Sequence, residues 1–251
     1  LGLKYSLAYR PRIQTMSPKF AGNAIPFSKP LVASNQQRYL SMVASKGNPW
    51  GGGDFSRLAV QHLGDLLGTQ RVILTQSCTA GLELIALLLD IQPGDEIIVP
   101  SYTFVSSAQA FTSRGATPIF VDVEPESMNL DVHEVERAIT KNTRAVVAVH
   151  YGGRCVDVEA LSRVCKAKGI FLVEDAAQAI FSSVQNKMAG RLGDFAAFSF
   201  HGTKNISAGE GGAVVINTSD RDFEAGLIAQ EKGTNRRALL EGKVDKYSWI
   251  S

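Results

Sequence analysis

The chain has 251 residues, of which 45% are hydrophobic and 20% charged, and its formal net charge is +2. These values are typical of a globular protein, and the length suffices for one large domain or for one domain plus part of another. They give no support to a nucleic-acid partner, since the lysines and arginines are scattered, and no apolar run reaches the ~18 residues that a membrane helix needs.

Residues 1–23 are predicted to be an irregular N-terminal extension. The first fifteen residues carry Lys4, Arg10 and Arg12 but no acid, and Met16 opens a stretch that reads like a normal bacterial start. We therefore expect Met16 to be the native first residue. A transit peptide is the alternative interpretation, although the segment lacks a clear amphipathic helix.

A glycine-rich segment, "SKGNPWGGGDF" (45–55), precedes the first predicted strand. One interpretation is a surface turn. The other is a loop near a ligand, because glycine lets the backbone approach closely. The sequence leaves both interpretations open.

Short apolar runs alternate with helix-length amphipathic segments along the rest of the chain. The apolar runs are continuous rather than alternating, which favours strands of a sheet covered on both faces. The predicted strands are 71–75, 96–100, 117–123, 144–151, 170–176, 195–200 and 212–217, and the predicted helices are 79–90, 106–115, 131–140 and 157–169. Asp131 and Asp157 stand at N-cap positions, and Gly115 and Gly169 at C-cap positions.

This alternation predicts an α/β domain with a mainly parallel sheet and helices on both faces. Ligands of such sheets bind beyond the carboxyl ends of the strands. Three polar clusters fall at such ends: "TQSCTAG" (75–81), "EDAAQ" (174–178) and "SFHGTKN" (199–205). Their convergence would make one site.

The stretch "QSCTAG" (76–81) places small and hydroxyl residues at the start of a helix. Free N–H groups and the helix dipole there suit an anion such as phosphate. A plain N-cap at Ser77 or Thr79 explains the same residues. No Walker or G-x-G-x-x-G pattern occurs, so a nucleotide is not favoured.

Asp175 and Lys204 suggest chemistry together. A carboxylate at the end of a buried strand needs a cation or a strong donor, and a protonated pyridine nitrogen would serve, although a helix-capping role is the simpler alternative. Lys204 is either a surface lysine or the lysine that forms a Schiff base with an aldehyde cofactor and then shuttles protons. Ser199, five residues before it, could reach a phosphate.

Other chemistries find less support in the sequence. His150, His201 and Cys155 lack the spacing of metal ligands, so we expect no metal site. No G-x-S-x-G elbow is present for serine hydrolysis. Three widely spaced cysteines favour reduced thiols in a cytosol over a disulfide framework.

Several motifs together resemble the sugar-nucleotide aminotransferases of the DegT/DnrJ/EryC1/StrS family, which are fold-type-I pyridoxal phosphate enzymes. The resemblance covers about residue 24 to the end, so residues 24–251 are predicted to be the large cofactor-binding domain, truncated before a C-terminal small domain that is largely absent. A fragment, a truncated reading frame and an isolated domain are all compatible with this pattern. The motifs are the run from "SCTAG" to "SMNLD" (77–131), "VHYGG" (149–153), "VEDAAQ" (173–178), "FSFHGTKN" (198–205) and "GEGGAVVIN" (209–217).

The resemblance implies a role for eight residues. Lys204 would be the Schiff-base lysine and Asp175 the partner of the pyridine nitrogen. Phe104 would stack on the ring, and Gln178 would hydrogen-bond near its phenolic oxygen. Thr79, Ala80 and Ser199 would hold the phosphate. Asn235 would reach the phosphate of the neighbouring subunit, because the family's active site lies at a homodimer interface.

The resemblance also implies the reaction. Glutamate would give its amino group to pyridoxal 5'-phosphate, which would then aminate C4 of a dTDP-4-keto-6-deoxyhexose. The tail 231–249 is similar to members that make precursors of bacterial surface glycans, such as lipopolysaccharide or enterobacterial common antigen, in the cytoplasm. Some relatives have histidine in place of the lysine and dehydrate the sugar, so Lys204 argues against that branch.

Two other interpretations stay open. One is a cofactor-binding module of a transcription regulator, although no basic or helix-turn-helix segment precedes the domain. The other is an inactive fragment that binds the cofactor at most and exposes apolar surface where a missing domain packed.

Overall fold

The computed structural model describes residues 28–29, 32–46 and 51–250. Within them, one seven-stranded sheet has the order β1-β9-β8-β5-β4-β2-β3. Strand β9 is antiparallel to both of its neighbours, and the remaining neighbours are parallel, which confirms the predicted mainly parallel sheet. The strands are β1 Val72–Thr75, β2 Glu96–Pro100, β3 Thr117–Val121, β4 Thr143–Val149, β5 Phe171–Asp175, β8 Phe195–Ser199 and β9 Gly212–Ile216.

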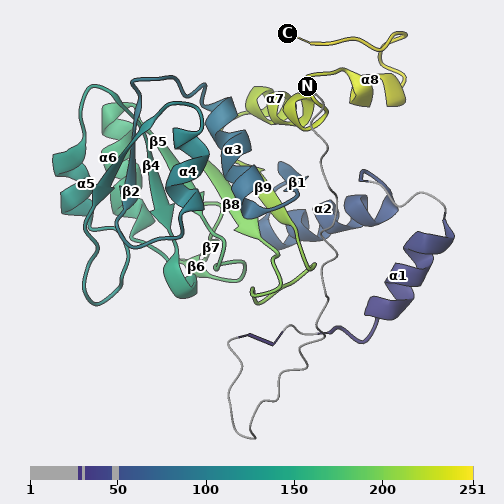
Figure 1. Cartoon of the computed structure of the whole chain (residues 1–251), viewed down its shortest axis with the longest axis horizontal. Helices are drawn as coiled ribbons and strands as arrows, with labels where there is room; N and C mark the ends of the chain where they lie inside the picture. The colour runs from purple at the N-terminus through teal and green to yellow at the C-terminus, as the bar shows by residue number, and fades with distance from the viewer. Residues whose placement is uncertain (1–27, 30–31, 47–50, 251) are drawn as a thin grey trace, which may run out of the picture.

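Helices cover both faces of the sheet, as predicted (Figure 1). One face carries α3 (Cys78–Leu88) and α4 (Ser106–Thr112), with α7 (Asp220–Gln230) packed beside α3. The other face carries α2 (Asp54–Leu67), α5 (Val132–Ala138) and α6 (Val158–Lys168).

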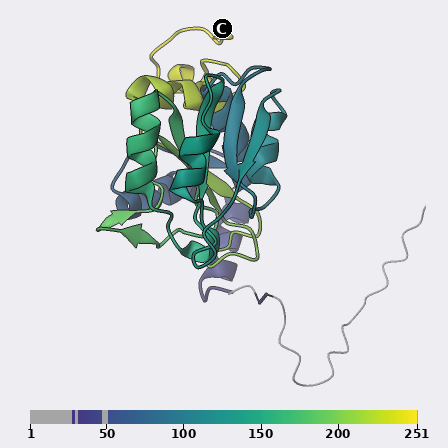
Figure 2. The same cartoon turned by 90° about the vertical axis from the view of Figure 1, so that its left-hand side faces the viewer.

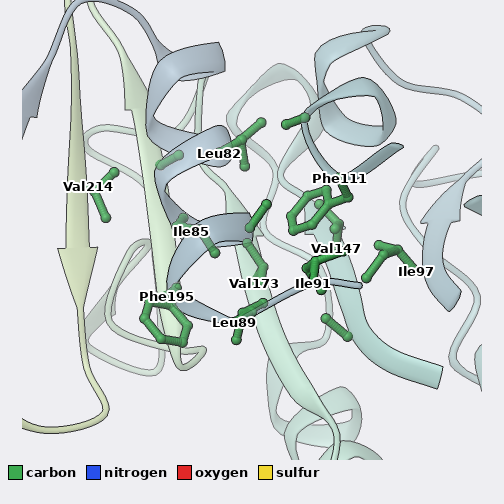
Figure 3. Close-up of a cluster of buried hydrophobic side chains, with 14 of the residues drawn as sticks. Leu82, Ile85, Leu89, Ile91, Ile97, Phe111, Val147, Val173, Phe195 and Val214 are labelled. Atoms are coloured by element: carbon green, nitrogen blue, oxygen red, sulfur yellow. The ribbon is translucent and has the colours of Figure 1, made fainter. Parts of the chain in front are cut away.

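The sheet separates the hydrophobic core into layers, which explains the continuous apolar strands. On the α3 side, Leu82 and Ile85 pack with Val173 and Val214 (Figure 3). Val215, the next residue of β9, belongs instead to the cluster under α2. Because successive side chains of a strand point to opposite faces, both faces must be apolar here.

All four predicted caps take part in closing a helix end. Asp131 accepts a hydrogen bond from the N–H of His133 at the start of α5. Asp157 accepts one from the N–H of Ala160 at the start of α6, and Gly169 ends α6 in the left-handed conformation.

Gly115 also closes a helix, although the helix is shorter than predicted. Helix α4 ends at Thr112, with Ser113 as its C-cap. Gly115 follows with a φ of 94°; its N–H donates to the Thr112 carbonyl at 2.9 Å, and the next N–H, of Ala116, donates to the Phe111 carbonyl at 3.4 Å. This is the pair of bonds with which a left-handed glycine closes a helix. A Cβ there would lie 2.8 Å from Cγ of Pro93, so the position also has no room for a side chain.

Several elements were not predicted: α1 (Gln36–Ser45), α2, the hairpin β6–β7 (Ser183–Val184 and Lys187–Met188), the 3-10 turn η1 (Tyr151–Gly153), α7 and α8 (Arg236–Leu240). Figures 1 and 2 place α7 and α8 at one end of the molecule and α1 toward the other. The predicted extension 1–23 and residues 47–50 of the glycine-rich segment lie outside the described residues. No described helix is both long and apolar enough to cross a bilayer.

Candidate active site

A pocket of about 300 Å³ lies at the carboxyl ends of β4, β5 and β8, beside the start of α3. All three predicted polar clusters contribute side chains to its wall. Six of the eight residues singled out from the sequence line it, namely Thr79, Phe104, Asp175, Gln178, Ser199 and Lys204. The described residues 51–55 of the glycine-rich segment do not line it.

The start of α3 is built as an N-cap. Ser77 has an extended backbone, and its Oγ accepts a hydrogen bond from the N–H of Ala80 at 3.1 Å. Thr75 Oγ1 donates to the Ser77 carbonyl at 2.7 Å and so secures the turn from the other side. Ala80 does not line the pocket, and its N–H is already engaged by the cap. Thr79 does line it, and its Oγ1 lies 2.7 Å from Ser106 Oγ.

Gly212 allows this helix start to sit directly on the sheet. The residue pairs with Thr75 of β1 and Ser199 of β8. A Cβ at Gly212 would lie 2.4 Å from the carbonyl carbon of Ser77 and 2.7 Å from the Cys78 nitrogen. The absence of a side chain therefore sets how close the start of α3 comes to β9.

Asp175, the last residue of β5, is a buried carboxylate in the pocket wall, with 5% of its surface exposed. Its Oδ2 accepts from Ser107 Oγ at 2.6 Å, and its Oδ1 accepts from the Ala177 N–H at 3.1 Å. Cys78 Sγ lies 3.9 Å from Oδ1. These donors are all neutral, and Asp175 takes part in no ion pair among the described residues.

Lys204 reaches the same pocket from the loop between β8 and β9. It is partly buried, and its N–H donates to the carbonyl of His201 at 2.9 Å. Glu210, the one nearby acid in the sequence, lies against His201 instead, at 3.5 Å from its Nε2. Within the described part of the chain, the Lys204 ammonium therefore has no carboxylate partner.

Three other predicted residues complete the wall. Phe104, between β2 and α4, is 70% exposed at the pocket. Gln178 accepts a hydrogen bond from the N–H of Gly152 and so ties the η1 turn to the site. Ser199 Oγ accepts from the His201 N–H at 3.3 Å.

Asn235 lies elsewhere. It precedes α8, and its side chain bonds to the Lys246 carbonyl and to Ser248, at 2.8 and 2.9 Å. It does not line the pocket of its own chain. Its reach into a neighbouring subunit stays a prediction, as do the binding roles of the other seven residues.

A buried pair, of which His150 lines the pocket, was not predicted from the sequence. His150 Nε2 lies 2.9 Å from Glu174 Oε2, and both side chains are fully buried. The His150 Nδ1 accepts from the Val156 N–H, so its Nε2 carries the proton and donates. The sequence did contain a signal for this pair, since His150 and Glu174 both interrupt apolar runs that were predicted to be strands. His150 had been considered only as a metal ligand. No metal-binding cluster occurs among the described residues.

Glu174 also holds the loop that leads into β8. Its two oxygens accept hydrogen bonds from the N–H groups of Gly190, Leu192 and Gly193. The carboxylate therefore joins β5, which ends in Asp175, to the segment before the strand that leads to Lys204.

Cys78 adds a buried thiol to the pocket wall. Burial raises its pKa well above the usual range, and the Asp175 charge raises it further, against a smaller lowering by Lys204. The thiol therefore stays protonated at neutral pH and can donate to Asp175.

The fold is that of an aminotransferase-like α/β domain, and the chain belongs to the DegT/DnrJ/EryC1/StrS aminotransferase family, whose sequence pattern matches residues 32–238. Three curated relatives illustrate its range. GDP-perosamine synthase of Vibrio cholerae is 36% identical over 194 residues, 77% of this chain and 53% of the relative. The spore coat polysaccharide biosynthesis protein SpsC of Bacillus subtilis is 35% identical over 200 residues, 79% of this chain and 50% of the relative. The dTDP-4-dehydro-2,3,6-trideoxy-D-glucose 4-aminotransferase of Saccharopolyspora spinosa is 42% identical over 151 residues, 60% of this chain and 39% of the relative.

Solved structures confirm the fold. The aminotransferase TlmJ from Streptoalloteichus hindustanus superposes with a TM-score of 0.83 at 30% identity, covering 90% of this chain and 60% of TlmJ. Spr1654 from Streptococcus pneumoniae, in its PLP-form, gives a TM-score of 0.79 at 27% identity, covering 90% and 61%. The matched part of the chain thus spans 39–53% of these curated relatives and about three fifths of the solved chains.

Proposed function

We propose that the chain is the cofactor-binding part of a pyridoxal 5'-phosphate-dependent aminotransferase. In this proposal it moves an amino group from glutamate to C4 of a dTDP-4-keto-6-deoxyhexose, a precursor of bacterial surface glycans. The observation that carries the proposal is the meeting of Lys204 and Asp175 in one pocket, neither of them ion-paired among the described residues, in a chain of this family.

The residues present fit the cofactor. A carboxylate that is buried among neutral donors is stabilised by a cation, and a protonated pyridine nitrogen supplies one. The start of α3 with Thr79, together with Ser199, offers dipole and hydroxyl groups for a phosphate. Phe104 exposes an aromatic face at the pocket, which an aromatic ring can cover. The PLP-form of Spr1654, which shares the fold, supports the same cofactor.

Each residue then has a defined task. Bound pyridoxal phosphate supplies an electron sink for negative charge on the carbon that carries the amino group. Asp175 keeps the ring nitrogen protonated through its carboxylate charge. Lys204 would anchor the cofactor through Nζ and, once released by substrate, would move a proton between the substrate carbon that carries the amino group and C4′ of the cofactor. Glu174, with His150, joins the end of β5, which carries Asp175, to the segment before β8, the strand that leads to Lys204.

The sugar nucleotide is the more specific part of the proposal. The Saccharopolyspora relative acts on a dTDP sugar at C4, which supports dTDP and C4. The Vibrio relative makes a GDP sugar, so GDP-4-keto sugars form the matched comparison. The name of SpsC supports a place in polysaccharide synthesis. We further propose a homodimer, acting in the cytoplasm, where the three free thiols would stay reduced.

The decisive experiment is covalent labelling of the lysine. The purified chain is mixed with pyridoxal phosphate, reduced with borohydride and digested, and the peptide that carries the pyridoxyl mass is located. We expect the label on Lys204. Lys204→Ala should abolish the label and the visible absorbance band, and Lys187→Ala, on the exposed hairpin, should leave both unchanged. A label of equal yield in the Lys204→Ala chain would refute the assignment.

Addition of substrates then separates turnover from binding. Glutamate should bleach the visible band, and a dTDP-4-keto-6-deoxyhexose should restore it faster than the GDP analogue does. A band that forms but that neither substrate alters would favour the alternative, a chain that binds the cofactor without turnover.

A further inference from the structure

Asp175 is held from both of its oxygens. Oδ2 faces Ser107 Oγ at 2.6 Å, while Oδ1 faces the Ala177 N–H at 3.1 Å and the Cys78 thiol at 3.9 Å. Ser107 is fully buried, so water does not compete for its hydroxyl. It comes from α4, 68 residues before Asp175 in sequence, so the contact depends on how α4 packs against the strand ends.

The hydrogen-bond directions follow from the available protons. An ionised carboxylate only accepts, so Ser107 must donate its single hydroxyl proton to Asp175. Ser107 Oγ also lies 2.7 Å from Thr103 Oγ1. Since the Ser107 proton is committed, Thr103 must be the donor in that contact. The protons therefore point one way, from Thr103 to Ser107 to Asp175.

Such a chain strengthens the last bond and fixes the plane of the carboxylate. A hydroxyl that itself accepts a hydrogen bond becomes a better donor, and bonds to an ionised acceptor are the strong ones. With Oδ2 and Oδ1 both engaged, the carboxylate cannot rotate about its Cβ–Cγ bond without breaking a buried hydrogen bond. Its free lone pairs therefore keep one direction relative to the pocket.

We propose that Ser107, supported by Thr103, is a positioning residue that orients the Asp175 carboxylate toward the ring nitrogen of the bound cofactor. This inference rests on the proposed function. It concerns a residue that touches neither substrate nor cofactor and acts through Asp175. It also gives a role to the fully buried Ser107 hydroxyl, at a position in α4 where packing alone would accept alanine.

The test measures the dissociation constant of pyridoxal phosphate by absorbance titration. Loss of one hydrogen bond to a charged group should weaken binding by Ser107→Ala about tenfold. Ser107→Thr keeps the hydroxyl and should bind within about twofold of the wild-type chain. Thr103→Val should weaken binding less than Ser107→Ala does, about threefold, because Ser107 can still donate. Ser113→Ala, an exposed serine just past α4, is the matched control and should change nothing.

A double-mutant cycle shows whether Ser107 acts through Asp175. In an Asp175→Ala chain, adding Ser107→Ala should cost less than about a further twofold, because no carboxylate remains to be oriented. A tenfold cost in that background would overturn the proposal, as would equal affinities of the wild-type and Ser107→Ala chains. If Ser107→Ala does not fold, Ser107→Thr and Thr103→Val carry the test, and unchanged affinity of Thr103→Val would overturn the proposal.

A second readout separates positioning from general stability. The absorbance maximum of the bound cofactor and its pH dependence report the protonation of the ring system, whereas a purely structural defect lowers the unfolding temperature of the cofactor-free chain and leaves them unchanged. We expect Ser107→Ala to shift this pH profile and Ser107→Thr to restore it. A wild-type chain that binds no pyridoxal phosphate would defeat the proposed function itself, whereas wild-type binding with an unmoved Ser107→Ala profile would defeat only this inference.

Discussion

Replacement of Gly212 by alanine is the sharpest test of how the helix start is built. Gly212 is buried at the beginning of β9, between the last residues of β1 and β8. An added Cβ would lie 2.4 Å from the carbonyl carbon of Ser77, 2.6 Å from its oxygen and 2.7 Å from the Cys78 nitrogen. All three atoms are backbone, so no side-chain rotation can relieve the overlap.

The expected cost follows from these distances. Real Cβ atoms essentially never approach other atoms closer than 3.0 Å, so β9 or the start of α3 must move by several tenths of an ångström. Overpacking of a buried site typically costs ~1–3 kcal/mol, and three rigid contacts place Gly212→Ala near the upper end of that range. A loss of ~3 kcal/mol corresponds to a fall of about 6–12 °C in unfolding temperature for a domain of this size.

Thermal unfolding of the cofactor-free chain measures this effect. Gly51→Ala is the matched control, because nothing lies within 4 Å of a Cβ at Gly51. Inorganic phosphate protection of the wild-type chain against heat should also be lost in Gly212→Ala, since the helix start moves away from the pocket. An unfolding temperature of Gly212→Ala within about 1 °C of the Gly51→Ala value would refute the reasoning.

Three further predictions concern the scaffold. Glu174→Gln turns an NH2 group toward backbone N–H donors, so the free energy of unfolding in urea should fall by about 3 kcal/mol. The exposed Glu83→Gln is the control and should lose almost none; similar urea midpoints for the two variants would contradict the buried network. Asp157→Ala removes the N-cap of α6 and should cost ~1 kcal/mol by the same assay, and a neutral result would show that the cap is dispensable. Burial, with a smaller contribution from Asp194, raises the pKa of the Cys165 thiol from 9.0 to about 12. The unfolded thiol then ionises first, so this stability is complete below pH 9 and is lost between pH 9 and pH 12. The wild-type chain should lose ~1.4 kcal/mol at pH 10 from this thiol, and Cys165→Ala, although less stable at pH 7, should lack that loss; parallel pH curves would argue against it.

The strands were predictable because burial on both faces leaves an uninterrupted apolar run that few other structures require. The same logic placed Asp175 at a strand end, and its position in β5 confirms that placement. The three polar clusters meet in one pocket because parallel strands end at a common edge. Helix α2 was missed although Val60, Leu63 and Leu67 recur at helical spacing, since the glycines before it drew the interpretation toward a loop.

The side-chain partners within the site were not predictable. Ser107 and Asp175 meet only because α4 packs beside α3 at the edge of the sheet, and nothing local to either residue indicates the contact. The pairing of His150 with Glu174 likewise requires knowing that β4 and β5 are neighbours. The partners of Asn235 were not predictable either, because its side chain hydrogen-bonds to Lys246 and Ser248 further along its own chain.

The reversed direction of β9 has a consequence for the loop that carries Lys204. Because β8 and β9 are antiparallel, the chain leaves the sheet and re-enters it at the same edge, whereas a parallel partner would have required a crossover to the far end. The Phe200 N–H donates to the Gly211 carbonyl at 2.8 Å, and the Gly202 N–H to the Gly209 carbonyl at 2.9 Å. The backbone pairing of β8 and β9 therefore continues into the loop, and Lys204 lies two residues beyond Gly202, the donor of the last of these hydrogen bonds. A change in the number of residues at the loop tip, between 205 and 208, would alter the tip without shifting the register that places Lys204.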